Sequence, residues 1–301
     1  MRPSETTMRE LARALDRHTR NDGEHATSIG ALLLYRLSAP TELTPSMLEP
    51  ALCLVAQGRK RAFVGKDVYH YDPSHHLVIS ADLPILAQIT QASAREPYLS
   101  LKLRFDAALG AELLASLPPG AVPPPERAVA VRPIEPALLE PVMRLVALLD
   151  DAAHVPVLAP LVIREITYRL LVGPDGARFR QILSADGHAR HIARALQWLR
   201  EHYAKPLRVE RLAQKVGMSA STFHHRFKTV TGFSPLQYQK RLRLQEARRL
   251  LLAEDIDAAE ASYRVGYESP SQFSREYRRL FGAPPRRDVA VLQVAPPPVD
   301  F

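Results

Sequence analysis

Hydrogen-bond donors and cations recur in two clusters of the sequence, about fifty positions apart. The first cluster comprises Ser221, Thr222, His224, His225 and Lys228, and the second comprises Ser271, Gln272, Ser274, Arg275 and Arg278. Amide, imidazole and guanidinium groups can donate hydrogen bonds to base edges, and lysine or arginine can contact phosphates. The two clusters therefore predict two surfaces that bind double-stranded DNA.

The clusters lie within a duplicated stretch of sequence. Residues 216–235 read VGMSASTFHHRFKTVTGFSP, and residues 265–285 read VGYESPSQFSREYRRLFGAPP. Phe223 aligns with Phe273, and the glycine and proline near the end of each stretch align as well. A repeat of this length indicates a duplicated supersecondary unit.

Each copy predicts a helix, a glycine turn and a second helix. Gly217 and Gly266 permit the positive φ that ends the first helix, and Ser219 and Ser269 are suitable N-caps for the second. Apolar and aromatic residues recur at helical spacing, which places the polar clusters on the opposite face. A solvated helical hairpin explains one such copy equally well, but two matching copies favour helix-turn-helix units.

The two predicted units, residues 209–230 and 257–281, are separated by a segment that predicts one long helix. Ser234 is its N-cap, Pro235 takes the first helical position and Gln237 completes a capping box. About eighteen helical residues span roughly 27 Å, close to one DNA turn of about 34 Å. One chain is therefore expected to read two adjacent major grooves.

The region from His188 to Asp288 resembles the DNA-binding domain of the AraC/XylS family of bacterial transcription regulators. Three blocks carry the resemblance: LAQKVGMSASTFHHRFK, TGFSPLQYQKRLRLQEARRLL and RVGYESPSQFSREYRRLFGAPP. It implies base contacts from three positions in each copy, which are Ser221, His224 and His225, and Ser271, Gln272 and Arg275. We expect Lys228 and Arg278 to contact phosphates. The first copy departs from the family pattern by placing His224 and His225 at base-contacting positions. Histidine is a weaker hydrogen-bond donor, and its donor capacity depends on pH.

The distribution of charge agrees with this prediction. The 301-residue chain has a net charge of +8; residues 186–288 hold 20 Lys and Arg against 11 Asp and Glu, and the remainder holds 20 against 21. The positive excess thus lies on the predicted DNA-binding unit. The lone Cys53 excludes an internal disulfide and a cysteine-based zinc cluster. A polar start and the lack of a long apolar run predict a cytoplasmic protein without a membrane span.

The first half predicts a small β-barrel or jelly roll, which makes the expected fold a two-domain α+β protein. Six short runs are typical of strands: ALLLYRLS, ALCLVAQ, KRAFVG, DVYHYD, HLVIS and YLSLKLRF. The stretch EPALCLVAQGRKRAFVGKDVYHYDPSHHLVISADLP resembles the N-terminal domain of one AraC subgroup. That resemblance implies a cupin-like regulatory barrel over residues 1–117. Because such barrels hold ligands in their mouth or interior, we expect a small-molecule effector.

A cupin-type metal-dependent enzyme with a helical accessory domain is the main alternative. His70, His75 and His76 suggest ligands, but the adjacent His75 and His76 point to opposite faces of a strand. We therefore assign no catalytic residue, metal ligand or cofactor. Cys53 is expected to be a buried apolar side chain, because a redox or electrophile sensor requires an exposed thiolate of low pKa. A sequence-neutral architectural DNA binder is disfavoured by the two capped recognition helices.

Residues 118–187 are expected to connect the two domains and to dimerise. The segment from Pro118 to Pro136 is proline-rich and predicts a connecting arm rather than a core element. Two apolar helices are predicted in ALLEPVMRLVALLDD and PVLAPLVIREITYRLLVG. They present more apolar surface than one hairpin buries, so we expect a homodimer, with RNA polymerase as a further partner. The DNA-binding domain is predicted over residues 188–288 and a flexible tail over residues 289–301.

Overall fold

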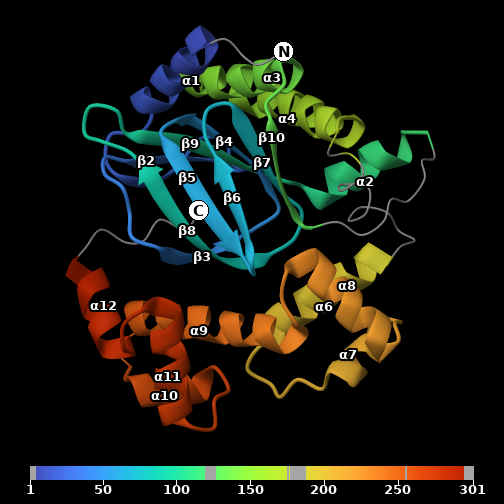
Figure 1. Ribbon diagram of the computed structural model, residues 1–301. Coiled ribbons are helices and arrows are strands. Elements are labelled where there is room, and N and C mark those ends of the chain that lie inside the picture. Colours follow the sequence, from blue (N-terminus) through green and yellow to red (C-terminus); the bar gives the residue numbers. More distant parts are fainter. Residues whose placement is uncertain (1–4, 119–126, 175, 177–187, 255, 295–301) are drawn as a thin grey trace.

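The computed structural model describes residues 5–118, 127–174, 176, 188–254 and 256–294 (Figure 1). A β-rich N-terminal part is followed by a helical C-terminal part. In Figure 1 the helical part lies below the sheets, and α1, α3 and α4 lie above them. Among the described helices, none is both long and apolar enough to cross a membrane. The predicted α+β fold with two domains is confirmed.

Two antiparallel sheets make up the N-terminal part. One has the strand order β1-β2-β9-β4-β7-β10, and the other has the order β3-β8-β5-β6. All six predicted strand runs are found, and the structure adds β1, β3, β8 and β10. The bounds are β1 (Gly23–Ala26), β2 (Leu32–Leu37), β3 (Thr44–Leu48), β4 (Ala51–Gln57), β5 (Arg59–Val64), β6 (Asp67–Tyr71), β7 (His75–Ile79), β8 (Leu83–Gln91), β9 (Tyr98–Arg104) and β10 (Val129–Pro133).

The burial pattern of each strand reflects its place between the layers. On β5, Lys60, Ala62 and Val64 are buried between the two sheets, whereas the residues between them are more exposed. On β9, every residue from Tyr98 to Leu103 is buried. This central strand faces the other sheet on one side and the covering helices on the other, so it is buried on both faces although its sequence alternates between leucines and polar residues.

Helices cover the outer face of the six-stranded sheet. Leu11 and Leu15 of α1, Val142 of α3 and Ile166 of α4 share one hydrophobic cluster with Leu101 of β9. The two predicted apolar helices are thus present and pack on the sheet as well as on each other. The bounds are α1 (Glu5–Arg17), α2 (Ala107–Ala115), α3 (Pro136–Ala147) and α4 (Val155–Val172).

The prediction of a connecting arm from Pro118 to Pro136 was wrong for its second half. Val129–Pro133 form β10, which pairs antiparallel with β7, and Ala128, Val129 and Ala130 are buried. The segment is an edge strand, where the proline that ends it costs no ladder hydrogen bond. Its partner lies about fifty residues earlier in the chain, so local patterns could not reveal the pairing.

The prediction of a flexible tail from residue 289 was also wrong in part. Pro285–Val294 form α12, and Val289 packs against the hydrophobic cluster of the second helical unit. Asp288 is 8% exposed. The helical part therefore continues past the predicted boundary, and residues 295–301 lie outside the described residues.

The two parts of the chain share a continuous hydrophobic cluster. Val64 at the end of β5 belongs to the same cluster as Phe233 and Tyr238 of the helical part. The Tyr238 hydroxyl donates to the carbonyl of Asp82 at 2.9 Å, and Arg200 pairs with the Asp82 carboxylate at 2.7 Å. The helical part is thus docked on the β-rich part through both apolar and charged contacts.

Candidate nucleic-acid interface

The first predicted unit is a helix-turn-helix formed by α7 (Val209–Lys215) and α8 (Ala220–Thr231). Gly217 has φ 75° in the turn between them, a value that side chains disfavour. The Ser219 hydroxyl accepts a hydrogen bond from the Thr222 amide at 3.3 Å and caps α8. Gly232, with φ 80°, ends α8 in the left-handed conformation. The predicted turn and cap are therefore confirmed.

The second unit repeats this construction with α10 (Ala258–Arg264) and α11 (Pro270–Phe281). Gly266 has φ 87°, and a Cβ at this position would lie 2.0 Å from the carbonyl oxygen of Ala204. Ser269 caps α11 by accepting from the Gln272 amide at 3.3 Å, and Pro270 takes the first helical position. The glycine is thus required both by the turn and by the close approach of the segment that precedes the first unit.

Aromatic side chains fix the inner face of each recognition helix. Phe223 and Phe227 are fully buried on α8, with ring centroids 5.4 Å apart, and Phe227 packs edge-on against Tyr238. Phe273 and Tyr277 take the equivalent places on α11, with centroids 5.5 Å apart. Each such ring buries a large apolar area. These buried rings therefore fix which face of each recognition helix points away from the core.

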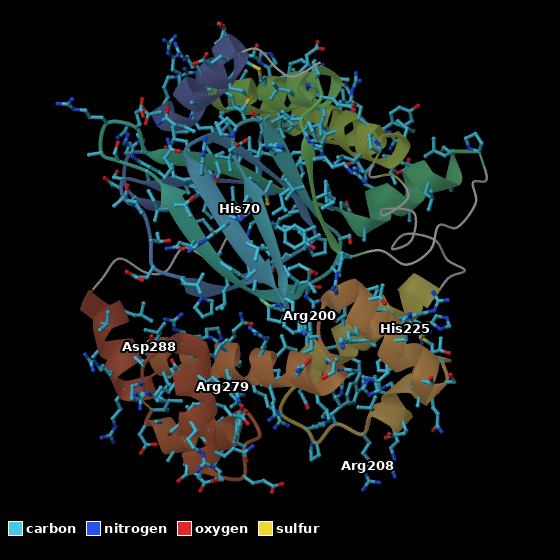
Figure 2. All side chains as sticks on the ribbon, in the orientation of Figure 1. His70, Arg200, Arg208, His225, Arg279 and Asp288 are labelled. Carbon is cyan, nitrogen blue, oxygen red and sulfur yellow. The ribbon has the colours of Figure 1, made fainter. Side chains whose placement is uncertain are left out.

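The predicted DNA-contacting residues lie on the outer faces of α8 and α11. Two of them, Thr222 and Ser274, are partly exposed, and the other eight are exposed: Ser221, His224, His225, Lys228, Ser271, Gln272, Arg275 and Arg278. Figure 2 shows His225 on the first unit, away from the sheets. The structure thus groups the first cluster on α8 and the second on α11.

Glu276 is a residue that the sequence reasoning missed. Its carboxylate accepts from Lys240 at 2.7 Å, from the Tyr267 hydroxyl at 2.9 Å and from the Gln272 amide group at 3.2 Å. Burial opposes ionisation of Glu276, but the hydrogen bonds from Lys240, Gln272 and Tyr267 outweigh it and lower the pKa. The charged carboxylate therefore holds Gln272 in one orientation on the exposed face. The four-residue spacing of Gln272 and Glu276 is the signal that could have revealed it.

The predicted long helix is α9 (Pro235–Ala253), which begins with the expected capping box of Ser234 and Gln237. Its 19 residues span roughly 28 Å at 1.5 Å per residue. Arg243 on α9 donates to the carbonyls of Tyr203 at 2.7 Å and Gly266 at 2.8 Å. Because Tyr203 lies in the segment that leads into the first unit and Gly266 lies in the turn of the second, Arg243 links the two ends of the helical part.

Further arginines lie near the recognition helices outside the predicted clusters. Arg208 and Arg279 are exposed, and Figure 2 shows Arg208 at the edge of the helical part farthest from the sheets. Arg241 lies close to Arg279; burial and this second positive charge both lower the pKa of Arg241. A phosphate between such groups would relieve their repulsion. No local motif marks these positions, so the sequence reasoning did not select them.

The barrel contacts α8 at its C-terminal end. Arg127 donates to the carbonyls of Lys228 at 2.9 Å and Thr229 at 3.2 Å, and it pairs with Asp67 at 2.8 Å. A cation is favourable at the negative end of the helix dipole. The Ala128 amide also donates to the Val230 carbonyl at 3.0 Å. These contacts leave the N-terminal half of α8 exposed.

The three histidines considered as metal ligands lie in different surroundings. His70 is exposed on β6, His75 pairs with Asp72 at 2.9 Å, and His76 is buried on β7. The described residues contain no group of three or more His, Cys, Asp or Glu side chains that could hold a metal. Burial raises the pKa of the Cys53 thiol to about 11, although Lys102 and Lys60 oppose the shift. Such a thiol is largely protonated at neutral pH, unlike a reactive cysteine.

Comparison with known families agrees with this geometry in both halves of the chain. Residues 28–178, half of the chain, match the family described as AraC-type transcriptional regulator N-terminus. The chain belongs to the AraC-type transcriptional regulators. Residues 212–289, which contain α8, α9 and α11, match a helix-turn-helix domain. This AraC-type regulator therefore combines an N-terminal regulatory domain with a C-terminal DNA-binding domain.

The AraC-type relatives include several characterised regulators. The chain is 33% identical over 151 residues to the transcriptional activator RhaS of Citrobacter koseri, covering 49% of this chain and 53% of RhaS. It is 31% identical over 134 residues to the transcriptional regulator ExsA of Pseudomonas aeruginosa, covering 44% and 48%. The virulence regulon activator VirF of Yersinia enterocolitica is 31% identical over 152 residues, covering 50% and 56%. The chain spans about half the length of the curated relatives it matches.

A solved structure shares the overall fold of this chain. ToxT from Vibrio cholerae, determined with an unsaturated fatty acid bound, has a TM-score of 0.57 at 10% identity. The match covers 88% of this chain and 96% of ToxT. The arrangement of a β-rich part and a helical part is therefore shared with ToxT.

Proposed function

We propose that this AraC-type regulator binds promoter DNA with both helix-turn-helix units and controls transcription in response to a small molecule. The observation that carries the proposal is the pair of capped recognition helices with exposed polar and basic faces, held by α9 and Arg243. Two matching recognition helices favour sequence-specific DNA binding over the alternatives of an architectural DNA binder and a metal-dependent enzyme. The domain division that we propose places the regulatory part before residue 175 and the DNA-binding part after residue 187.

Selection of bound sites from a random DNA pool tests this proposal. Purified chain should recover a motif with two half-sites about ten base pairs apart, because each recognition helix enters one of two successive major grooves. The affinity for the best site should also fall steeply with salt concentration. Binding that depends on salt but yields no motif would reduce the DNA interaction to charge alone and refute the proposed function.

Several observations support a homodimer through α4. Val157, Leu161, Tyr168 and Val172 are 67%, 60%, 45% and 48% exposed and form one stripe along this helix. The four positions are symmetric about the point between Arg164 and Glu165, one residue from the middle of the helix. In an antiparallel pair of α4 helices, Val157 therefore faces Val172 of a second copy and Leu161 faces Tyr168. A self-complementary patch of this kind fits a two-fold dimer.

Leu161→Glu is expected to weaken dimerisation by about 10- to 100-fold, because it buries a carboxylate in an apolar seam. Sedimentation of the full chain over a concentration series measures this effect. Val68→Glu is a matched control, since Val68 is an exposed apolar residue of β6 at 46% exposure. A wild-type chain that remains monomeric at high concentration, or a Leu161→Glu chain that dimerises like the wild type, contradicts the α4 interface.

The proposed effector would bind the N-terminal part and act through its contacts with α8. The solved ToxT structure has an unsaturated fatty acid bound, which supports a small-molecule effector for a protein of this fold. The names of RhaS and VirF as activators support activation, with RNA polymerase as a partner. Enzymatic activity is not part of the proposal, because the relatives are regulators and the histidines of the barrel do not converge.

A further inference from the structure

A hollow lies at one edge of the six-stranded sheet, at the corner where the chain turns from β10 into α3. It has a volume of about 480 Å³, within the range of roughly 300–1,000 Å³ that small-molecule sites occupy. β10 is the last strand of this sheet. The described lining comes from β10, the start of α3, the end of α4 with the two residues after it, and His76 of β7. Segments that are distant in the sequence thus border one space.

The inner wall of this hollow is apolar. Ile134, Leu138 and Leu170 line it and are 1%, 7% and 3% exposed. All three belong to the hydrophobic cluster that packs α1, α3 and α4 on the sheet. The hollow is therefore a place where the edge of this cluster can receive the apolar part of a ligand and remove it from water.

Charged groups also line the hollow, and positive charge is in excess among them and their partners. Arg132 of β10 and Arg169 of α4 line it together with Glu135. Arg169 donates to the Glu165 carboxylate through Nε at 2.9 Å and Nη2 at 2.7 Å, and Arg144 donates to the same carboxylate. The hydrogen bonds from Arg169 and Arg144 lower the pKa of Glu165, so its charged carboxylate is shared between them. These three arginines and two glutamates leave an excess of one positive charge.

We propose that this hollow binds an amphipathic monocarboxylate, with the carboxylate on Arg132 and Arg169 and the apolar chain on the inner wall. Guanidinium groups are suited to carboxylates because they offer paired N–H donors in one plane. An excess of one positive charge favours a monoanion over a doubly charged phosphate. The buried apolar wall favours a chain of several carbons over a short acid such as acetate.

β10 joins this hollow to the first helix-turn-helix unit (Figure 1). Arg132 and Pro133 at the end of the strand line the hollow. Just before its start, Arg127 donates to a carbonyl at the C-terminal end of α8, and the Ala128 amide donates to the Val230 carbonyl at 3.0 Å. A ligand that displaces Arg132 therefore acts on the strand that contacts α8. The assignment names the effector class of the proposed regulator, and it rests on the proposed function only for its effect on DNA binding.

Calorimetric titration of the full chain with butyrate, hexanoate and octanoate tests the assignment. Octanoate should bind saturably, and the affinity should rise about fourfold with each added methylene, because each buried methylene adds to the hydrophobic free energy of binding. Octanol has the same chain without the charge and should bind far more weakly. Inorganic phosphate at equal concentration should not displace octanoate.

Arg169→Met should weaken octanoate binding by about 10- to 100-fold, because it removes the charged donor but keeps a stem of similar bulk. Arg164→Met is the matched control. Arg164 lies on the same helix and pairs with Glu112 at 2.8 Å, and its side chain is 43% exposed against 37% for Arg169. Arg164 is not among the residues of the described lining. Its substitution removes a comparable ion pair and should leave the affinity for octanoate unchanged.

Ala137→Glu is a second variant that tests the same site without removing an ion pair. Ala137 is exposed and lines the hollow in the first turn of α3, where an acidic residue is favourable. The fold should therefore be retained, whereas the added carboxylate should repel that of octanoate and weaken its binding about tenfold. Ala137→Gln has nearly the same size without the charge and should bind octanoate more tightly than Ala137→Glu.

Any of four results would overturn the assignment. A wild-type chain without saturable octanoate binding, or an affinity that does not depend on chain length, contradicts an apolar chain held in the hollow. Octanol that binds as tightly as octanoate, or an octanoate affinity that is unchanged in Arg169→Met or in Ala137→Glu, contradicts a carboxylate held by the arginines. These titrations contain no DNA, so a failure of the DNA-binding proposal appears only in the site selection and cannot be confused with them.

Discussion

Asp288→Ala is expected to destabilise the second helix-turn-helix unit by about 3–5 kcal/mol. The Asp288 carboxylate accepts two hydrogen bonds from the Arg248 guanidinium, at 2.8 and 2.9 Å, and a third from the Tyr277 hydroxyl at 2.8 Å. Arg248 and Asp288 are only 9% and 8% exposed. Removing the acid leaves a buried guanidinium without its counter-charge, which costs far more than the pair itself contributes. Figure 2 places Asp288 at the junction of α12 with the helical part.

Urea denaturation followed by circular dichroism measures this loss, and hydrogen exchange locates it in α11 and α12. Glu246→Ala is the matched control, because Glu246 forms an exposed ion pair with Arg249 on the same helix. That change should cost less than about 1 kcal/mol. A double change of Arg248 and Asp288 to leucine should recover most of the stability. A loss in Asp288→Ala no larger than that in Glu246→Ala would show that the buried pair does not hold α12.

Arg275→Ala is expected to lose about 1–3 kcal/mol of specific DNA binding and to relax discrimination at one base position. Arg275 is exposed on α11, in the same outward cluster as Gln272, whose orientation Glu276 fixes. A guanidinium in this place can donate two hydrogen bonds to one guanine. Because the side chain is exposed, its truncation should change stability by less than about 0.5 kcal/mol.

Competition binding with singly substituted sites, repeated at several salt concentrations, measures this effect. Arg278→Ala is the control, since Arg278 is an exposed arginine on the same helix, three residues away. It should weaken binding uniformly across sequences and reduce the salt slope by about one. Uniform weakening in Arg275→Ala as well would assign Arg275 to phosphate and leave base recognition to other residues of α11.

The helical part of the fold was predictable because its signals are local. Gly217, Ser219, Gly266 and Ser269 are each explained by a turn or a cap within a few residues. The same holds for the capping box that starts α9. Because the same turn and cap residues occur in both copies, each copy supported the interpretation of the other. Local rules of this kind suffice wherever hydrogen bonds close within one helical turn.

The barrel was predictable only in outline, because its pairing is non-local. The pairing of β10 with β7 joins residues about fifty positions apart, and β9 is buried on both faces although its alternating sequence is typical of a half-exposed strand. The α12 helix was missed since its anchor, the Asp288 pair with Arg248, joins residues 40 positions apart. Contacts of this range leave no periodic trace in the sequence.

The sequence predicted which faces of the recognition helices carry the candidate site, but not the side-chain hydrogen-bond networks around it. The rotation of α8 and α11 followed from the aromatic residues, so the ten outward residues could be named. The contact of Glu276 with Gln272, the bridging role of Arg243 and the burial of Lys60 and Lys102 all depend on residues that are distant in the sequence or on tertiary packing. Lys60 and Lys102 in particular occur within strand-like runs, where a lysine is ordinarily expected to face solvent.

The tandem arrangement of two unequal recognition helices gives any DNA site read by them a direction. α8 presents His224 and His225, whereas α11 presents Gln272 and Arg275, and α9 fixes their order. An operator turned end for end would offer each helix the bases meant for the other. Orientation toward the start of transcription would then be encoded in the protein itself. In such a system, inverting the operator would be equivalent to deleting it.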